Sequence, residues 1–410
     1  MLDIRLIRSD PDATRAALAR RGDVAADAID RVLALDARWR EVTAAAEELR
    51  AEQNRFNKGR RGAPTTDERE QMAALAARGR ELTDTETSVR SQLDELLWGL
   101  PNTPLDETPA TDTVLREVGS AGRTGLDHLA LAGSMIDMER GASLSGSRFA
   151  YLRGDMVMLE LALVQYAMHK LIAAGFEPVI PPVLVRERAL FGTGFLPDTE
   201  QQIYRLPDDD LYLVGTSEVA LASIHREEIV AAETLPLRYA GFSPCFRREA
   251  GAAGKDTRGI FRVHQFDKVE MFSYVEPPES ADEHERILAI EESILQELNI
   301  PYRVVAIAVN DLGASAAKKY DCEAWMPGQE AYREVTSCSN TTDYQARRLD
   351  IRYRGADGKP AHVHTLNGTA VTWRHMIALL ENGQLENATV VLPEVLVSFG
   401  APATMAATAA

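Results

Sequence analysis

The chain has 410 residues, of which 45% are hydrophobic and 26% are charged. This composition is typical of a folded globular protein with roughly two or three domains, and it excludes disordered and collagen-like chains. Acidic residues outnumber lysine and arginine by 62 to 45, a net charge of -17, so any nucleic acid has to bind at a local basic patch.

The first residues carry charges where a signal peptide has its apolar segment, and no run approaches the roughly 20 apolar residues of a membrane span. The three cysteines, Cys245, Cys322 and Cys338, are far apart and form no Cys-x-x-Cys pair. Neither a disulfide framework nor a zinc site is therefore indicated. We expect a cytoplasmic protein with no membrane partner and no zinc.

Two heptad patterns predict a pair of long N-terminal helices. Apolar residues recur at steps of three and four from Val32 to Phe56, and again from Met72 to Leu100. The turn-forming residues 59–64 between them predict an antiparallel pair. At about 1.5 Å per residue, residues 29–56 would extend roughly 40 Å. We expect a coiled-coil arm over residues 29–98 within an N-terminal domain 1–105; a coiled coil used for dimerisation is the alternative.

The predicted tip of this arm is basic, although the protein is acidic. Between residues 50 and 61 a single acid, Glu52, accompanies five cations: Arg50, Arg55, Lys58, Arg60 and Arg61. Clustered lysine and arginine side chains are what binding to a phosphate backbone requires. A solvated helix end would show the same run of charges.

A stretch rich in proline, threonine and aspartate predicts a linker up to about residue 113, followed by a domain over residues 114–400 and an alanine-rich tail over 401–410. In this domain apolar spacing predicts helices at 156–174, 279–298 and 369–381. A strand is predicted at 176–185, where the pair Pro181-Pro182 suits an edge or interface. No strand–helix–strand alternation is present, so the fold class is α+β.

A long hairpin in this domain concentrates the chemically active side chains. Alternation along a strand over residues 261–272 places these even-numbered positions on one face: Arg262, His264, Phe266, Lys268 and Glu270. Arg247 and Glu249 share a face of the preceding strand, and residues 250–259 join the two. Such a platform can hold a phosphate, stack a flat base and pair an amine. An exposed hairpin with salt bridges is the alternative.

Four segments resemble seryl-tRNA synthetase of the bacterial type. They are Phe246-Arg-Arg-Glu249 with Arg258-Gly259, His264-Gln-Phe-Asp-Lys-Val-Glu270, Tyr332-Arg-Glu-Val-Thr-Ser-Cys-Ser-Asn340, and His364-Thr-Leu-Asn-Gly-Thr369 leading into Arg374. The resemblance covers nearly the whole chain, to about residue 396. It implies a serine–tRNA ligase with a class II catalytic domain, an antiparallel sheet flanked by helices, which forms a homodimer around the strand near Pro181.

The resemblance also implies the residues that bind ATP. Arg247 would grip the α-phosphate, Glu249 would read the adenine amino group, and Phe266 would stack on adenine, with Arg248 and Val263 nearby. These are the same side chains that the predicted hairpin presents together.

A second set of ATP ligands is implied in the next two motifs. Glu334 and Ser337 would hold Mg²⁺ and phosphate at the two ends of a stretch that includes Val335 and Thr336. Arg374 would bind the γ-phosphate from the first turns of a helix, whose N-terminus favours anions. Strict alternation would put Glu334 and Ser337 on opposite faces of a strand, so we expect a bulge or a strand end between them.

For L-serine, the resemblance implies a pocket made of Thr216, Ser217, Glu218, Glu270, Asn367 and Thr369. The two carboxylates suit an ammonium group and Thr369 suits a small hydroxyl. Activation would need no protein nucleophile, because the serine carboxylate itself attacks the ATP α-phosphorus, with Arg247 and Arg374 as the catalytic residues. The seryl group would then pass to the 3′ end of serine tRNA, which the basic arm would grip by its shape and backbone.

Two segments depart from the commoner family pattern. The third motif, residues 367–374, is one residue shorter, and residues 392–400 replace the usual C-terminal sequence. Three alternatives therefore remain open: a duplicated copy with a biosynthetic or resistance role, a serine-adenylating enzyme with a different acceptor, and a non-catalytic tRNA-binding protein.

Overall fold

The computed structural model of the chain divides into two units, Met1–Thr103 and Pro104–Ala410. The structure describes residues 1–58, 65–197, 202–250, 256, 258–356 and 358–406. The first unit is helical. It contains α1 (Ile4–Ser9), α2 (Pro11–Ala19), α3 (Asp23–Lys58) and α4 (Thr66–Gly99).

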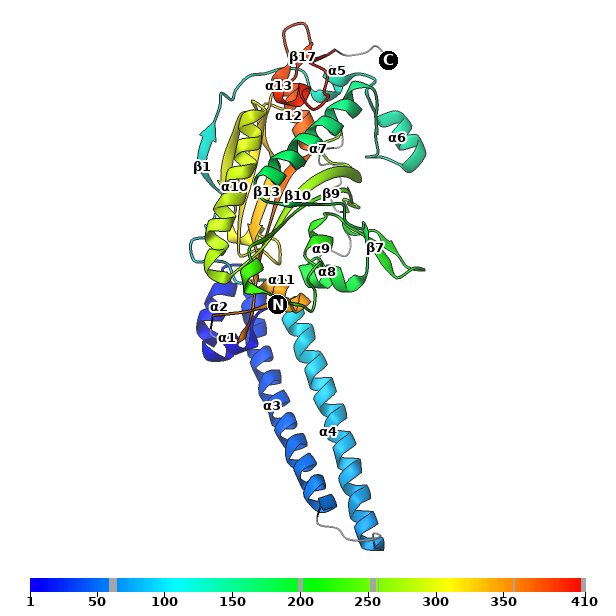
Figure 1. Ribbon diagram of the computed structural model, residues 1–410, viewed down its shortest axis with the longest axis vertical. Coiled ribbons are helices and arrows are strands. Elements are labelled where there is room, and N and C mark those ends of the chain that lie inside the picture. Colours follow the sequence, from blue (N-terminus) through cyan, green and yellow to red (C-terminus); the bar gives the residue numbers. More distant parts are fainter. Residues whose placement is uncertain (59–64, 198–201, 251–255, 257, 357, 407–410) are drawn as a thin grey trace. The chain divides into compact units, whose positions relative to one another are not determined.

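Helices α3 and α4 form the antiparallel pair that the heptads predict (Figure 1). Buried apolar residues of the seam include Val42 and Leu49 on α3 and Leu93 on α4. Two polar residues, Gln53 and Glu86, also lie at seam positions and make hydrogen bonds between the helices. The Thr43 hydroxyl donates to Glu86 at 2.9 Å, and the Gln53 amide donates to the Leu75 carbonyl at 3.0 Å. The predicted arm is confirmed.

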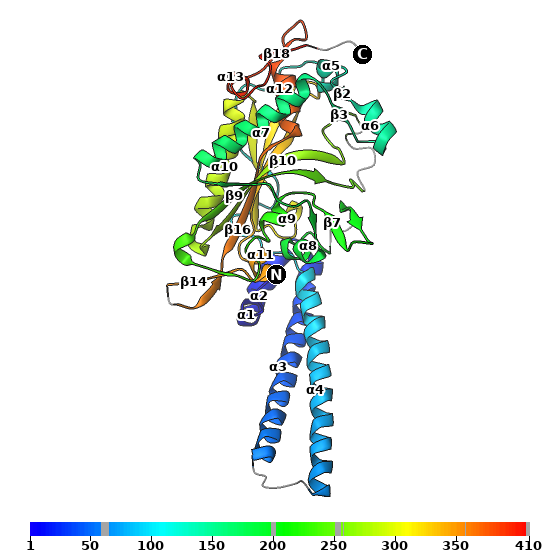
Figure 2. The same cartoon turned by 45° about the vertical axis from the view of Figure 1, so that its right-hand side comes forward.

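A mixed eight-stranded sheet forms the centre of the second unit (Figures 1 and 2). In spatial order its strands are β1 (Thr113–Val118), β11 (Tyr302–Ala306), β12 (Lys318–Met326), β13 (Ala331–Asn340), β16 (His364–Thr372), β10 (Gln265–Val275), β9 (Leu237–Phe246) and β4 (Glu177–Val179). Neighbours are antiparallel, as predicted, except for the parallel pair of β4 and β9.

Helices α7 (Asp155–Ala173) and α10 (Ser280–Glu297) cover one face of this sheet. Helix α12 (Trp373–Gly383) follows β16 directly and packs into the same apolar core. Among the described residues, one helix, α7, is long and apolar enough to cross a membrane when judged by length and composition alone. Residues such as Leu159, Leu163 and Leu171 of α7 are buried in the core, as expected of a core helix.

Shorter elements surround the sheet: α5 (His128–Ala132), β2 (Ile136–Asp137), α6 (Met138–Ser145), β3 (Tyr151–Leu152), β5 (Leu184–Val185), α8 (Glu187–Thr193), β6 (Arg205–Leu206), β7 (Leu211–Leu213), α9 (Glu218–Leu221), β8 (Ile229–Val230), α11 (Tyr344–Leu349), β14 (Arg352–Arg354), β15 (Pro360–His362), β17 (Val390–Val391), α13 (Glu394–Val397) and β18 (Thr404–Met405). Strand β18 pairs with β17 and lies inside the predicted tail.

Two predicted elements need correction. The single strand expected over residues 176–185 is interrupted at Pro181-Pro182, because proline cannot donate a ladder hydrogen bond; β4 lies in the main sheet, whereas β5 pairs with β7 in a small one. The helix expected over residues 369–381 begins only at Trp373. Residues 369–372 instead complete β16, so the apolar spacing there belongs to a buried strand.

Two bulges interrupt the regular alternation of the central strands. Along β12 and β13, Cys322 pairs with Thr336 but the next residue, Glu323, pairs with Glu334, which leaves Val335 as an extra residue. Along β10 and β16, Ala370 is the extra residue in the same way. An extra residue shifts the side chains that follow it to the other face. The bulge expected between Glu334 and Ser337 is thus confirmed.

Candidate active site

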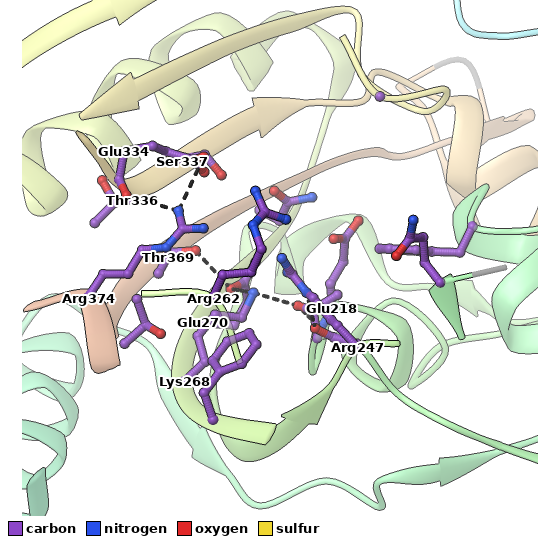
Figure 3. Close-up of a pocket in the computed structure, with 18 of the residues that line it drawn as sticks. Glu218, Arg247, Arg262, Lys268, Glu270, Glu334, Thr336, Ser337, Thr369 and Arg374 are labelled. Carbon is purple, nitrogen blue, oxygen red and sulfur yellow. Dashed lines mark hydrogen bonds and ion pairs between the residues drawn. The ribbon is translucent and has the colours of Figure 1, made fainter. Parts of the chain in front are cut away.

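A cavity of about 680 Å³ opens among β10, β13, β16 and the segments that follow β7 and β9 (Figure 3). Phe266, Lys268 and Glu270 of β10 line it, as strand alternation predicts. Asp267, which points the opposite way, meets Glu160 of α7. The cavity therefore lies on the face of the sheet opposite α7.

The cavity brings together most of the residues singled out in the sequence: Thr216, Glu218, Arg247, Glu249, Val263, Phe266, Glu270, Glu334, Val335, Thr336, Ser337, Asn367, Thr369 and Arg374. Of the residues that the resemblance implies for ATP or serine, two are not among its lining residues. Ser217 is buried, and its hydroxyl donates to the Gly241 carbonyl at 3.4 Å. Arg248 is held by its backbone N–H, which donates to the Gln202 carbonyl.

Three arginines line the cavity, and we call them the arginine cluster (Arg247, Arg262 and Arg374). Arg247 directly follows β9. Its Nε donates to the Gly215 carbonyl at 3.3 Å, and its guanidinium lies 5.2 Å from the centre of the Phe266 ring. An arginine beside an aromatic face suits a ligand that carries both a phosphate and a flat base.

The predicted strand alternation fails at Arg262 and His264, because β10 begins only at Gln265. Arg262 reaches the cavity from the preceding loop and donates to Glu249 Oε2 at 2.6 Å. This ion pair holds Glu249, whose φ of +50° is strained for a residue other than glycine. The His264 ring contacts the Arg247 carbonyl at 2.8 Å and is not among the lining residues.

The bulge in β13 presents Glu334 and Ser337 to the same cavity. Arg374 contacts Glu334 twice, at its carbonyl (2.9 Å) and at its carboxylate (3.2 Å). Burial alone would raise the pKa of the Glu334 carboxyl, but Arg374, Lys319 and Arg247 outweigh it, so that pKa lies below its usual value. Glu334 is therefore ionised at neutral pH.

The cavity wall also contains an acidic pocket (Thr216, Glu218, Glu270, Asn367 and Thr369). Glu270 is 2% exposed, and its Oε2 accepts a hydrogen bond from the Thr369 hydroxyl at 3.4 Å. The extra residue Ala370 in β16 sets the register in which Thr369 faces Glu270. Two carboxylates and two hydroxyls close together suit a small ligand that carries an ammonium group and a hydroxyl.

Glu218 enters this pocket from the first turn of α9. Its carboxylate accepts a hydrogen bond from Gln345 of α11 at 2.8 Å, and Gln345 in turn accepts one from Thr365 of β16 at 2.9 Å. Burial, and then the nearby charge of Glu270, raise the pKa of the Glu218 carboxyl to about 7. Glu218 can thus change its charge near neutral pH.

Two family models match the chain. The model of the seryl-tRNA synthetase N-terminal domain matches residues 1–104, and the model of the class II tRNA synthetase core domain (G, H, P, S and T) matches residues 202–383. The serine–tRNA ligase of Thermobifida fusca (strain YX) is 49% identical, and the alignment covers 97% of each chain. That of Nocardia farcinica (strain IFM 10152) is 48% identical over 97% of this chain and 98% of its own.

The chain belongs to the seryl-tRNA synthetase family. Solved structures agree with this assignment. Seryl-tRNA synthetase from Pyrococcus horikoshii complexed with ATP is 41% identical, with a TM-score of 0.93 over 100% of both chains. Cytoplasmic serine–tRNA ligase from Naegleria fowleri in complex with AMP is 30% identical, with a TM-score of 0.89 over 100% of this chain and 99% of its own. The alternative roles raised from the sequence find no support in these names.

As a seryl-tRNA synthetase family member, the chain is a ligase, and the sequence resemblance implies Mg²⁺ beside ATP. No group of three or more histidine, cysteine, aspartate and glutamate side chains in the described ranges is arranged to hold a metal ion. Mg²⁺ needs fewer protein ligands, because it keeps several waters and shares phosphate oxygens. The ionised Glu334 carboxylate and the Ser337 hydroxyl offer such oxygens on the cavity wall, so these residues fit Mg²⁺.

Sequence reasoning gave no role to two residues of this seryl-tRNA synthetase site. Gln345, which is fully buried, holds Glu218 from a separate helix, and no local pattern in the sequence connects the two. Lys268 was placed on the correct strand face, but its contacts inside the acidic pocket were not foreseen. A lysine between Phe266 and Glu270 on one face of the strand was the available signal, since a lysine is rarely buried without a partner.

Proposed function

We propose that the chain activates L-serine with ATP to seryl-adenylate and transfers the seryl group to the 3′ end of serine tRNA. The observation that carries this proposal is that the arginine cluster and the acidic pocket line one cavity. The solved relatives are complexes with ATP and with AMP. We assign residues 1–105 to a tRNA-binding domain and residues 114–400 to the catalytic domain, with 401–410 as a tail.

In the activation step, one carboxylate oxygen of serine attacks the ATP α-phosphorus while the bond to the β-phosphate oxygen breaks. Pyrophosphate leaves with the bonding electron pair, and no protein nucleophile takes part. Arg247 is the residue proposed to hold the α-phosphate and Arg374 the γ-phosphate, so that both neutralise charge on the reacting phosphates. Phe266 provides the face on which adenine stacks and Glu249 the carboxylate that reads its amino group.

The remaining nucleotide contacts follow from the same assignment. Val263, and the backbone around Arg248, Val335 and Thr336, would border the nucleotide. Mg²⁺, held by Glu334 and Ser337, would supply further positive charge at the phosphates. Both residues line the cavity beside Arg374, which supports this placement.

Serine selection is proposed to reside in the acidic pocket. Glu218 and Glu270 would accept hydrogen bonds from the α-ammonium group, and Thr369 would meet the side-chain hydroxyl. Thr216 and Asn367 complete the walls, with Ser217 behind them. A site whose buried polar groups pair with a substrate hydroxyl can reject the analogue that lacks it by about 10⁴-fold or more. Alanine would therefore be rejected, and threonine would be excluded by its extra methyl group.

Transfer to tRNA would use the N-terminal arm. Arg50, Arg55 and Lys58 are exposed on the last turns of α3, which supports binding to a phosphate backbone. Arg60 and Arg61, which belong to the same predicted tRNA-binding set, lie outside the described residues.

We further propose a cytoplasmic homodimer. Helix α7 exposes Met158, Leu161 and Ile172 on the side away from the core, and Ile180, just after β4, is 81% exposed. Such a patch favours burial against another protein surface. The proposed occupant is the same patch of a second copy, as in the homodimer that the sequence resemblance implies.

The deciding experiment measures ATP–pyrophosphate exchange and tRNA charging with serine, alanine, threonine and cysteine in parallel. Serine is expected to support both reactions and to exceed alanine by about 10⁴-fold in kcat/KM. Exchange without charging would indicate a different acceptor. Tight tRNA binding without exchange would contradict the proposed activation step.

Charge reversal at the arm is expected to separate the two reactions. In the variant with Arg55→Glu and Lys58→Glu, the KM for tRNA should rise at least about tenfold, because each lost phosphate contact weakens binding. Serine-dependent exchange should stay within about twofold. A matched pair on the same helix, Arg31→Glu with Arg38→Glu, is the control for net charge. An equal rise of the KM for tRNA in both pairs would contradict a local binding site.

Serine affinity is expected to depend on pH through Glu218. Its pKa of about 7 means that the carboxyl is mostly protonated below that pH and cannot bind the ammonium as an anion. The KM for serine should therefore rise as pH falls below 7, approaching tenfold per pH unit, whereas the KM for ATP should not follow this course. Glu218→Gln should remove the dependence. A flat profile for the unmodified protein would contradict the assignment.

A further inference from the structure

A lysine lies inside the acidic pocket, among the residues assigned to serine. Lys268 of β10 is 6% exposed. Its Nζ pairs with Glu270 Oε2 at 2.5 Å (Figure 3). It also donates to the Thr216 hydroxyl oxygen at 2.7 Å. An ammonium group loses its hydration when it is buried, and such a group is kept only where hydrogen bonds and opposite charges replace the water. The contacts of Lys268 meet that requirement.

The charges of the pocket do not balance without this lysine. Glu218 and Glu270 are both buried, and the charge of Glu270 raises the pKa of the Glu218 carboxyl. Among the described residues that line the cavity, the other cations contact different partners: Arg247 the Gly215 carbonyl, Arg262 Glu249, Lys319 Asp321, and Arg374 Glu334. With Lys268 present, two ionised carboxylates leave one net negative charge, which is what a single incoming ammonium group neutralises.

Lys268 also fixes the geometry of its partners. Glu270 Oε2 accepts hydrogen bonds from both Lys268 and Thr369, one from its own strand and one from β16. Within the described part of the chain, no donor reaches the other oxygen, Oε1. The carboxylate is thus held by one oxygen and offers the second to a ligand. The Thr216 hydroxyl is held in turn, since it accepts from Lys268 and from the backbone N–H of Glu218.

We propose that Lys268 is the positioning residue of the acidic pocket. It holds Glu270 and Thr216 in place and supplies the positive charge that lets both carboxylates await the substrate ammonium. It acts through these neighbours, and the proposal rests on the assignment of the pocket to serine. The predicted signature is a defect confined to serine binding, with nucleotide binding unchanged.

The test compares Lys268→Met, which keeps the length of the side chain, with Lys268→Gln, which keeps a donor without the charge. Lys268→Met is expected to raise the KM for serine at least about 30-fold in ATP–pyrophosphate exchange, with the KM for ATP within about twofold. Lys268→Gln should show a smaller rise. The pH below which serine binding weakens should move upward in both, because the lysine charge lowers the pKa of Glu218. Lys318→Met, at a lysine that pairs with Glu107 and Glu285, is the matched control and should leave these values unchanged.

Chemical rescue separates charge from packing. In Lys268→Ala, added propylammonium should restore serine affinity by at least about tenfold, whereas 1-propanol at the same concentration should not. Calorimetric binding of ATP to the same variant shows that its fold is intact.

Three results would overturn the proposal: an unchanged KM for serine in Lys268→Met, an equal loss for serine and ATP, or equal rescue by propanol. If the unmodified protein shows no serine-dependent exchange, the proposed function itself is contradicted. That result is distinct from the three above, because it does not depend on any Lys268 variant.

Discussion

Replacement of Arg247 by alanine is expected to lower serine-dependent ATP–pyrophosphate exchange by about 10³-fold in kcat/KM. In the proposed reaction this guanidinium holds the phosphate at which the bond forms and breaks. Its loss therefore raises the energy of the transition state more than that of the bound substrates. The side chain is aligned before any ligand arrives, by its hydrogen bond to the Gly215 carbonyl and by the Phe266 ring. Removing it also takes away the guanidinium that lies against that ring.

Two companion variants sharpen this expectation. Arg247→Lys keeps the charge but loses the planar fork of donors, so its activity should fall between those of the unmodified protein and Arg247→Ala. Arg303→Ala is the matched control, because Arg303 also pairs with a neighbour, Glu323, and also lies over an aromatic ring, that of Tyr332. It lies outside the cavity and should leave exchange within about twofold. A loss in Arg303→Ala as large as that in Arg247→Ala would point to a general loss of folded protein.

Replacement of Glu270 by glutamine is expected to raise the KM for serine by roughly 10³-fold, the upper part of the range for removing one partner of a buried charge pair. The amide cannot supply a negative charge to the serine ammonium. It also leaves Lys268 buried without its anionic partner, although glutamine has nearly the same shape as glutamate. Both effects act on the acidic pocket alone, so ATP should bind as before.

The measurement is a pair of KM values, for serine and for ATP, from exchange assays at saturating concentrations of the other substrate. Glu323→Gln is the control, since Glu323 pairs with Arg303 at 2.6 Å outside the cavity. Equal rises for serine and ATP in Glu270→Gln would contradict a pocket dedicated to the amino acid. The melting temperature of each variant reports any general destabilisation.

Local periodicity predicted the parts of the fold that depend on one repeating contact. The arm followed from heptads, and even its polar seam positions, Gln53 and Glu86, lie between the helices. The face of β10 followed from alternation at Phe266, Lys268 and Glu270. These regularities are local because each side chain meets neighbours at a fixed spacing along the chain.

Sequence reasoning failed where distant segments decide the local structure. The strand position of residues 369–372 depends on pairing with β10, and apolar spacing alone could not distinguish it from a helix. Arg262 reaches its partner Glu249 from a loop and not from a strand. The link between Gln345 and Glu218 joins residues 127 positions apart, which no local pattern records.

Because β13 and β16 each contain one extra residue, a deletion or insertion in these strands would disturb the structure far more than a substitution. Loss of one codon before Glu334 or Thr369 would shift the register of strand pairing by one residue. The later side chains of that strand would then face the opposite side of the sheet. A conservative exchange at the same place alters one contact only. Across generations, change around Glu334 in β13 should consist of point replacements, whereas frame-preserving gains and losses of codons should collect in exposed connections.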